Sequence, residues 1–489
     1  MEYKPQPSTT HVHVQPRLII HGGAGNITPA SLGPELYAAY RSSLLTIVSK
    51  AHTYLTTPQS NSASKSSKLP SSLEAATYAV TLLENNALFN SGHGAVFTRD
   101  GINELEASVM VSRGQAKRGV GVTGLRHVRN PILLARKVLE HGRDDLLGLG
   151  KNPDNDGEPD VPSAQGHTLI HGPTAEKLAK QYGLEMVKPS YFFTQKRWDE
   201  HVRALEREKE QKQEGLDNAG VSATWSMDEY LPQGTVGAVA LDGEGVICVA
   251  TSTGGMTNKL TGRIGDTPVV GAGFWAEEWT EAGDPTSPHK NGSRNPLYNP
   301  GPTVVLSDAL KGLIADCLPS PFLYTPAHPG SSGQLTTTRS IGVSGTGNGD
   351  SYLRIAAART VGAIARYSTL PSAVALTKVA GPSGELQKSA EGRWGTTGEG
   401  EGGIIGLESV VVRDANGNVV ETRSEILQDY NCGGMFRAWI DEEGVAYARI
   451  FRKDQDISSS YIGEDKPEDP RVWSGEKIWR DWLDGSLLP

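Results

Sequence analysis

Cysteine is scarce in this sequence. Its 489 residues include only three, Cys248, Cys317 and Cys432. They form no pair at metal-binding spacing, and Cys432, which lies in a glycine-rich stretch, reads as a small buried residue. So few cysteines are typical of a protein from a reducing compartment. We therefore expect a cytoplasmic protein.

Long apolar runs and an excess of positive charge are also lacking. No apolar run reaches the ~18–20 residues that a membrane span requires. The polar N-terminus, residues 1–17, lacks the apolar core of a signal peptide and reads as a disordered tail. Lys and Arg number 47 against 56 Asp and Glu, so the net charge is −9. This balance argues against nucleic acid or an anionic membrane as a partner.

Glycine, by contrast, is abundant, with 57 residues in short clusters rather than one low-complexity tract. Glycine tolerates positive φ and lets backbone approach a ligand closely. Several tight turns that converge on a small ligand would produce this pattern. The clusters are 21–25, 91–94, 254–255 and 345–349.

Hydrophobic periodicity predicts helices and strands in comparable number. The expected helices cover 34–52, 73–85, 131–141, 201–213 and 351–365, with 201–213 charged and solvated. The expected strands cover 18–20, 109–111, 120–122, 236–241, 246–251, 269–270, 341–344, 410–412, 419–420 and 444–451. They show no regular βαβ spacing, which favours a layered α+β fold over a doubly wound sheet.

Four stretches read as loops or insertions. Residues 56–72 are rich in Ser, Thr and Pro, and 151–233 form a connector that ends in an exposed segment. Residues 277–335 look like an insertion around a short helix near 310–315, and 391–403 form a Gly/Glu-rich loop.

The most informative position is Thr235. It follows Gly234 and opens the apolar run Val236 to Leu241, which reads as a buried strand. Cleavage after Gly234 would give Thr235 a free α-amino group beside its own hydroxyl, so that nucleophile and base belong to one residue. An exposed connector upstream would let the new terminus move away. Taken alone, a threonine that opens a strand is more simply a β-branched residue in a sheet.

Five ordered signatures favour the catalytic interpretation. They are Ile20-His-Gly-Gly-Ala-Gly25, Phe89 to Asp100, Gly234 to Asp242, Thr251 to Asp266, and Ser344-Gly-Thr-Gly-Asn-Gly-Asp350. Together they resemble the plant-type asparaginase and isoaspartyl peptidase family of N-terminal nucleophile hydrolases. The resemblance covers most of 18–150, 234–276 and 341–445.

The resemblance implies an αββα sandwich, with two central, mainly antiparallel sheets flanked by helices. Residues 18–489 would form one domain. Self-cleavage would divide it into an α part, 18–234, with the connector 151–233, and a β part, 235–489, with the insertions 277–335 and 391–403. It also implies a homodimer of processed units that acts on a small-molecule substrate.

The site residues are carried over position by position from the family. Thr235 corresponds to the nucleophile freed by cleavage after Gly234, and Thr253, eighteen residues later, to a threonine that hydrogen-bonds it. Arg263 corresponds to the clamp on the substrate's α-carboxylate, which a fork of donors suits. Asp266 corresponds to the acceptor for its α-amino group. Taken alone, Arg263 and Asp266 could be an exposed i, i+3 ion pair.

The remaining site residues come from two other signatures. Thr346 and the backbone of Gly347 match the oxyanion-hole pair, and with Asn348 and Gly349 they complete the substrate-binding set. Asn90 matches an asparagine close to the nucleophile. A phosphate-cradling loop is the weaker interpretation of 345–349, because the Gly-Lys-Ser/Thr ending is missing.

The resemblance implies no cofactor for catalysis. It does imply a structural sodium ion, held through the backbone carbonyls of the loop that follows the second expected helix. The corresponding residues are Leu83, Glu84, Asn86, Phe89, Ser91 and His93. As isolated side chains, His21 and His93 read as turn or packing histidines.

The implied reaction is acyl transfer from the side-chain amide of asparagine, or from a β-aspartyl peptide bond, through a β-aspartyl-threonine ester. Three alternatives stay open. A glycosylasparaginase-like enzyme fits residues 254–259 less well, and a threonine endoprotease would not need the clamp of Arg263 and Asp266. An uncleaved scaffold protein would keep the bond between Gly234 and Thr235 intact.

Overall fold

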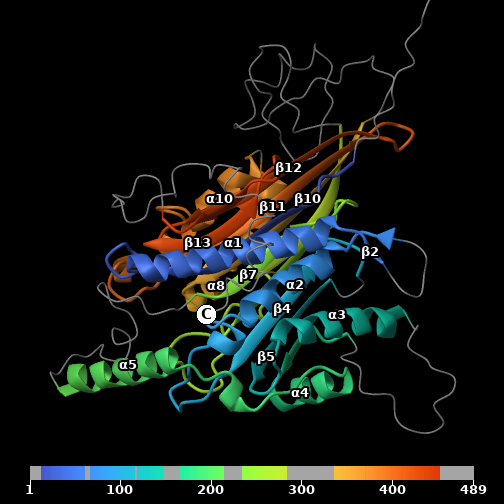
Figure 1. Cartoon of the computed structure of the whole chain (residues 1–489). Coiled ribbons are helices and arrows are strands. Elements are labelled where there is room, and N and C mark those ends of the chain that lie inside the picture. The colour runs from blue at the N-terminus through green and yellow to red at the C-terminus, as the bar shows by residue number, and fades with distance from the viewer. Residues whose placement is uncertain are drawn as a thin grey trace, which may run out of the picture.

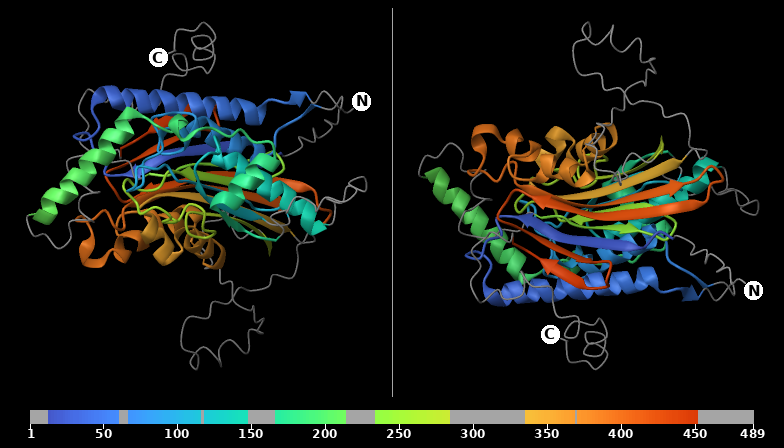
Figure 2. Two further views of the ribbon diagram at one scale, coloured as in Figure 1. Left: turned by 90° about the horizontal axis from the view of Figure 1, so that it is seen from below. Right: turned by 90° about the horizontal axis from the view of Figure 1, so that it is seen from above.

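Two β-sheets packed face to face form the centre of the molecule, and helices cover both outer faces (Figures 1 and 2). The computed structural model describes residues 13–60, 67–115, 118–147, 166–213, 234–283, 335–368 and 370–451. The predicted αββα layering of an N-terminal nucleophile hydrolase is confirmed, with sheets of eight and four strands. Among the described residues no helix is both long and apolar enough to cross a membrane.

The larger sheet has the strand order β14-β13-β1-β7-β8-β4-β5-β6, and only β5 and β6 pair in parallel. Along β1 the side chains alternate between two cores, with Leu18 and Ile20 facing the helices and Ile19 facing the second sheet. The strands are β1 Arg17–Gly25, β4 Leu105–Val111, β5 Gly119–Leu125, β6 Leu169–His171, β7 Val236–Leu241, β8 Ile247–Thr253, β13 Gly434–Ile440 and β14 Ala446–Arg449.

The smaller sheet is antiparallel throughout, in the order β12-β11-β10-β9. Its strands are β9 Phe274–Ala282, β10 Thr336–Gly347, β11 Gly402–Arg413 and β12 Val419–Tyr430. The strands expected over 410–412 and 419–420 pair as a hairpin, and Asn416 and Gly417 lie in the turn between β11 and β12, where Gly417 has a φ of 83°. A further pair, β2 Gln59–Ser60 and β3 Ser67–Lys68, lies outside both sheets.

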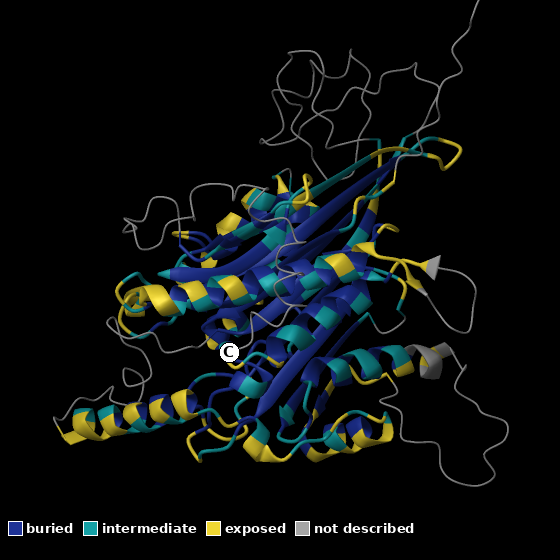
Figure 3. Cartoon of the chain, viewed as in Figure 1, coloured by how far each residue is buried: buried dark blue, intermediate teal, exposed yellow. Residues whose placement is uncertain are grey.

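Helices α1 to α4 pack on the larger sheet and α9 and α10 on the smaller one. Buried residues line both sheets and the helix faces against them, as Figure 3 shows. A capping box between Ser71 and Glu74 fixes the start of α2. The α-helices are α1 Pro34–Thr56, α2 Ser72–Glu84, α3 Pro131–Leu147, α4 Gly172–Gln181, α5 Gln195–Gln213, α8 Gly349–Ile355, α9 Ala357–Tyr367, α10 Ser372–Ala380 and α11 Glu385–Ser389. Single 3₁₀ turns are η1 Gly92–Gly94, η2 Pro189–Tyr191 and η3 Glu391–Arg393.

Several predicted boundaries were wrong. The tail does not extend to residue 17, because Arg17 is buried and begins β1. The insertion does not begin at residue 277, because 277–282 pair with β10 as part of β9. Residues 284–334, with the helix expected near 310–315, lie outside the described residues. Gly402 and Gly403 belong to β11 rather than to the 391–403 loop.

The secondary structure predicted from the sequence also differs from the structure in four places. The connector 151–233 contains β6 and α4, which were not predicted, and the helix predicted over 201–213 begins earlier, as α5, at Gln195. The strand expected over 269–270 does not form, because Val269 lies in a bend and Val270 makes only an isolated β-bridge with Phe274. The single helix expected over 351–365 is divided at Ala356, whose φ is 47°, into α8 and α9. Helix α5 is not solvated all round, because Arg197, Glu200 and His201 are buried.

Candidate active site

Thr235 lies directly before β7 and is buried, with 4% of its surface exposed. Gly234 packs against the backbone of β1. A Cβ placed on Gly234 would lie 2.4 Å from the Cα of Gly23 and 2.8 Å from the amide nitrogen of Ala24. Since both neighbours are backbone atoms, the space accepts glycine and no larger residue without a shift. The bond predicted to be cleaved is therefore held at the junction of β1 and β7.

The partner of the Thr235 hydroxyl differs from the one we expected. The register pairs Val236 with Ser252, so one step further Thr235 stands opposite Thr253. Yet the Thr253 hydroxyl accepts a hydrogen bond from the Gly255 amide at 3.0 Å. The Thr235 hydroxyl instead contacts the hydroxyl of Thr267, 3.1 Å away. The predicted role of Thr253 toward the nucleophile stays a prediction.

Asn90 is buried and holds the turn that follows Thr253. Its side-chain amide donates to the carbonyl of Gly255 at 2.7 Å, and its carbonyl Oδ1 accepts from the Val96 amide at 3.0 Å. The backbone of Asn90 also accepts from the amide of Gly254. Asn90 therefore fixes the turn at the end of β8 beside the nucleophile.

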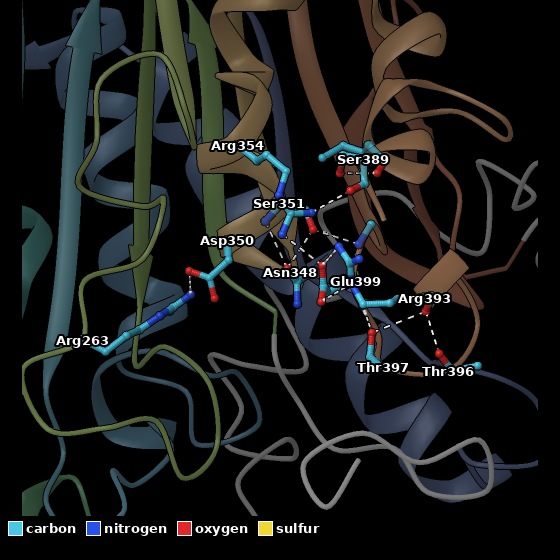
Figure 4. A network of polar contacts seen from close by, with 12 residues as sticks. Arg263, Asn348, Asp350, Ser351, Arg354, Ser389, Arg393, Thr396, Thr397 and Glu399 are labelled. Atoms are coloured by element: carbon cyan, nitrogen blue, oxygen red, sulfur yellow. Dashed lines mark hydrogen bonds and ion pairs between the residues drawn. The ribbon is translucent and has the colours of Figure 1, made fainter. Parts of the chain in front are cut away.

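Arg263 and Asp266 point toward the same end of the small sheet. Arg263 Nη2 lies 3.1 Å from Asp350 Oδ1, without hydrogen-bond geometry (Figure 4). Asp350 is 57% exposed, whereas Asp266 is buried and its Oδ2 has no hydrogen-bond partner. A Cβ on Gly349 would lie 2.5 Å from Asp266 Oδ1 and 3.1 Å from Arg263 Nη2. The guanidinium group of Arg263, the buried carboxylate of Asp266 and the glycine at position 349, which adds no side chain, therefore lie together at this end of the sheet.

Burial dominates the electrostatics of the site. Desolvation raises the pKa of Asp266 to about 7, although the nearby Arg263 opposes this shift. His21, on β1 behind the nucleophile, has its pKa lowered to about 3 by complete burial. Its Nε2 lies 2.8 Å from Ser344 Oγ on β10, so it bridges the two sheets. Asp266 changes charge near neutral pH, while His21 stays neutral there.

Thr346, the last residue but one of β10, has a buried hydroxyl without a hydrogen-bond partner. Tyr352 donates to the Thr346 carbonyl at 3.0 Å and to that of Gly403 at 2.7 Å, which fixes the backbone around it. Gly347 has a φ of 141°, and a Cβ there would lie 2.3 Å from the Glu401 carbonyl, so only glycine fits. An unused hydroxyl on a rigid backbone is the kind of donor that an oxyanion hole requires.

Asn348 is the N-cap of α8, since its Oδ1 accepts from the amide of Ser351 at 3.1 Å. The segment after α11 packs onto the same helix, as Figure 4 shows. There Arg354 donates to the Ser389 carbonyl at 2.7 Å and pairs with Glu399 at 3.0 Å. Part of the predicted 391–403 loop is therefore anchored to the helix that carries Asp350.

The loop predicted to bind sodium packs two of its carbonyl oxygens closely against glycines. A Cβ on Gly94 would lie 2.1 Å from the Phe89 oxygen, and one on Gly92 would lie 2.3 Å from the Glu84 oxygen. Hard cations prefer such oxygen ligands. Within the described residues no cluster of three or more His, Cys, Asp or Glu could hold a metal. The sodium site stays a prediction, and the His93 ring contacts the Tyr191 carbonyl at 2.6 Å.

Sequence reasoning missed Thr267, Asp350 and the bridge between His21 and Ser344. Thr267 directly follows the signature that ends at Asp266, and Asp350 is the last residue of another signature, but no local pattern marked their side chains. The half-buried Cys432 has its sulfur near the carbonyl of Gly434. The arrangement as a whole offers the buried hydroxyl of Thr235, the unpaired hydroxyl of Thr346, and the oppositely charged pair Arg263 and Asp266, which suits a zwitterion. Such a site can transfer an acyl group from an amino-acid-like substrate.

Comparison with known proteins gives a consistent result. A family described as asparaginase matches residues 14–151 and 160–283. The chain is 38% identical over 262 residues to an isoaspartyl peptidase of Escherichia coli K12, covering 53% of this chain and 67% of the relative. It is 33% identical over 267 residues to a plant-type L-asparaginase of Pyrococcus furiosus, covering 53% and 70%. An isoaspartyl peptidase/L-asparaginase of Xenopus laevis is also 33% identical, covering 54% and 67%.

Proposed function

The chain belongs to the asparaginase family of plant-type asparaginases and isoaspartyl peptidases, N-terminal nucleophile hydrolases, and on that premise we propose that it is a self-processing threonine amidohydrolase. Its substrates would be L-asparagine, β-aspartyl dipeptides, or both. One observation carries the proposal. Thr267 contacts the Thr235 hydroxyl, and its neighbour Asp266 holds an unpaired buried carboxylate oxygen beside Arg263. The residue that contacts the Thr235 hydroxyl and the carboxylate suited to an amino-acid head group are thus neighbours in one turn.

Self-processing would use the Thr235 hydroxyl against the carbonyl of Gly234. The acyl group moves from nitrogen to oxygen, and water then hydrolyses the ester, which leaves a free α-amino group on Thr235. The close packing of Gly234 on Gly23 holds the carbonyl in place for this step. The α-amino group, with an ordinary pKa of ~7.7–8.0, suits a general base near neutral pH.

In turnover, Arg263 would hold the α-carboxylate of the substrate and Asp266 its α-ammonium group. The Thr235 oxygen attacks the β-carbonyl carbon while its proton moves to the α-amino group. The Thr346 hydroxyl and the Gly347 amide face the oxyanion. Ammonia or an amino acid leaves with that proton, and water hydrolyses the β-aspartyl ester to release aspartate.

We also propose that Leu83, Glu84, Asn86, Phe89, Ser91 and His93 hold a structural sodium ion through their main-chain oxygens. The main-chain oxygens of Glu84 and Phe89, which pack closely on Gly92 and Gly94, support it. The ion would stabilise the loop that carries Asn90, and no reaction step passes through it. A homodimer and a cytoplasmic location complete the proposal.

The test combines a mass measurement with two substrates. The wild type is expected to yield two fragments, 1–234 and 235–489, from the 52.2 kDa chain, to release ammonia from L-asparagine, and to release leucine from β-Asp-Leu. Thr235→Ala should stay intact and inactive. Thr336→Ala, a matched change at the start of β10, should process normally. An intact wild-type chain that turns over neither substrate would refute the proposal and favour a scaffold role.

A further inference from the structure

Thr267 lies at the nucleophile although no motif identified it. Its hydroxyl oxygen is 3.1 Å from the Thr235 hydroxyl oxygen. Both residues are buried, with 1% of Thr267 and 4% of Thr235 exposed. Because little water reaches this pair, each hydroxyl depends on the other as a hydrogen-bond partner.

The direction of this hydrogen bond follows from the proposed chemistry. The proton of the Thr235 hydroxyl has to reach the α-amino group of the same residue. The Thr267 hydroxyl can then only donate, and its proton points at a lone pair of the Thr235 oxygen. A hydrogen bond to an oxygen that is losing its proton favours the charged form. Thr267 therefore aids the step that makes Thr235 nucleophilic.

Backbone hydrogen bonds hold Thr267 in place independently of its side chain. The Asp266 carbonyl accepts from the amides of Val269 at 3.0 Å and Gly273 at 3.2 Å, which closes the turn around Thr267. The Gly273 carbonyl accepts from the amide of Gly345 at 2.8 Å, which ties the turn to β10 next to Thr346. The hydroxyl can therefore be removed without removing a bond that shapes the turn.

We propose that Thr267 is a catalytic residue that donates a hydrogen bond to the Thr235 oxygen and links the nucleophile to the substrate clamp at Asp266. This inference rests on the proposed function. The hydroxyl of Thr253 accepts a hydrogen bond from the Gly255 amide, whereas the hydroxyl of Thr267 contacts that of Thr235 directly. Thr267 is therefore the better placed of the two to act on the nucleophile.

The test removes the hydroxyl at constant shape with Thr267→Val. A hydrogen bond to a charged group contributes ~1.5–3 kcal/mol, so kcat for L-asparagine on the processed enzyme should fall roughly 10- to 150-fold. KM should stay within about twofold, because the charged clamp is unchanged. Thr267→Ser should restore most of kcat. The half-time of self-cleavage, followed by intact mass, should lengthen in Thr267→Val and recover in Thr267→Ser.

A matched control is available nearby. Thr257 is also 1% exposed, but its hydroxyl has no hydrogen-bond partner. Thr257→Val should therefore leave kcat unchanged. If Thr267→Val does not fold, Thr267→Ser against Thr267→Ala isolates the hydroxyl, and the same loss of kcat is expected in the alanine variant alone. Wild-type kcat without the hydroxyl would overturn the inference, whereas an inactive, uncleaved wild type would instead refute the proposed function.

Discussion

Gly234→Ala offers a steric test of self-processing. The new methyl group would lie 2.4 Å from the Cα of Gly23 and 2.8 Å from the Ala24 amide nitrogen. Ordinary van der Waals contact begins near 3.4 Å, so one of the two backbones has to move by about 1 Å. Gly234 is not among the residues with positive φ, and the penalty therefore comes from contact rather than from backbone strain.

A displacement of this size acts on the carbonyl that Thr235 attacks. Misplacing a reacting group by about 1 Å can cost ~10²-fold in rate. We therefore expect the half-time of cleavage, measured by intact mass after purification, to lengthen on that order. Once the bond is broken, residue 234 no longer belongs to the chain that begins at Thr235. The kcat of the processed fraction should therefore stay within about twofold of the wild type.

The control is Gly33→Ala. Gly33 precedes α1 with a φ of −63°, and a Cβ there meets nothing within 4 Å. This variant should be cleaved at the wild-type rate. Cleavage of Gly234→Ala as fast as that of Gly33→Ala would show that the packing on Gly23 does not control the reaction.

Two further predictions follow from charges around the site. Burial lowers the pKa of His21 from 6.5 to about 3. Between these two pH values the unfolded chain binds a proton at His21 and the native state does not. The free energy of unfolding therefore decreases as pH falls from 6.5 toward 3. By pH 4.5 the loss from this group is about 3 kcal/mol. Urea unfolding at pH 7 and 4.5 should show a smaller loss in His21→Asn, and equal losses would contradict the assignment. Asp350→Asn removes an exposed ion-pair partner of Arg263, an interaction worth ~0.2–1 kcal/mol. Arg263 is then free to bind the substrate carboxylate, so KM for L-asparagine should fall roughly 1.5- to 5-fold. Glu185→Gln, which breaks an exposed ion pair elsewhere, should leave KM unchanged.

The sequence predicted some strands because their signal is local, but it did not predict β6, β9 or β13. The run from Val236 to Leu241 is apolar throughout, and β7 has those bounds. Helix α5 shows where local signals fail. Its charge pattern predicted a solvated helix, yet Arg197 is buried, pairs with Glu200 at 2.9 Å, and donates to the Gly94 carbonyl at 2.9 Å. Composition does not reveal whether a charge has buried partners, so only the tertiary structure could place this helix against the loop after η1.

The same distinction explains why the motifs led to Thr253 and the structure to Thr267. The spacing of the two motifs reflects how β7 pairs with β8. Val236 pairs with Ser252, so Thr235 is one step from standing opposite Thr253. A threonine hydroxyl can also bond its own backbone two residues on, and Thr253 does so at Gly255. Thr267 reaches Thr235 through a turn that two hydrogen bonds to the Asp266 carbonyl close. A motif therefore identifies which backbone segments surround a nucleophile, whereas the hydroxyl that contacts it depends on how those segments fold back.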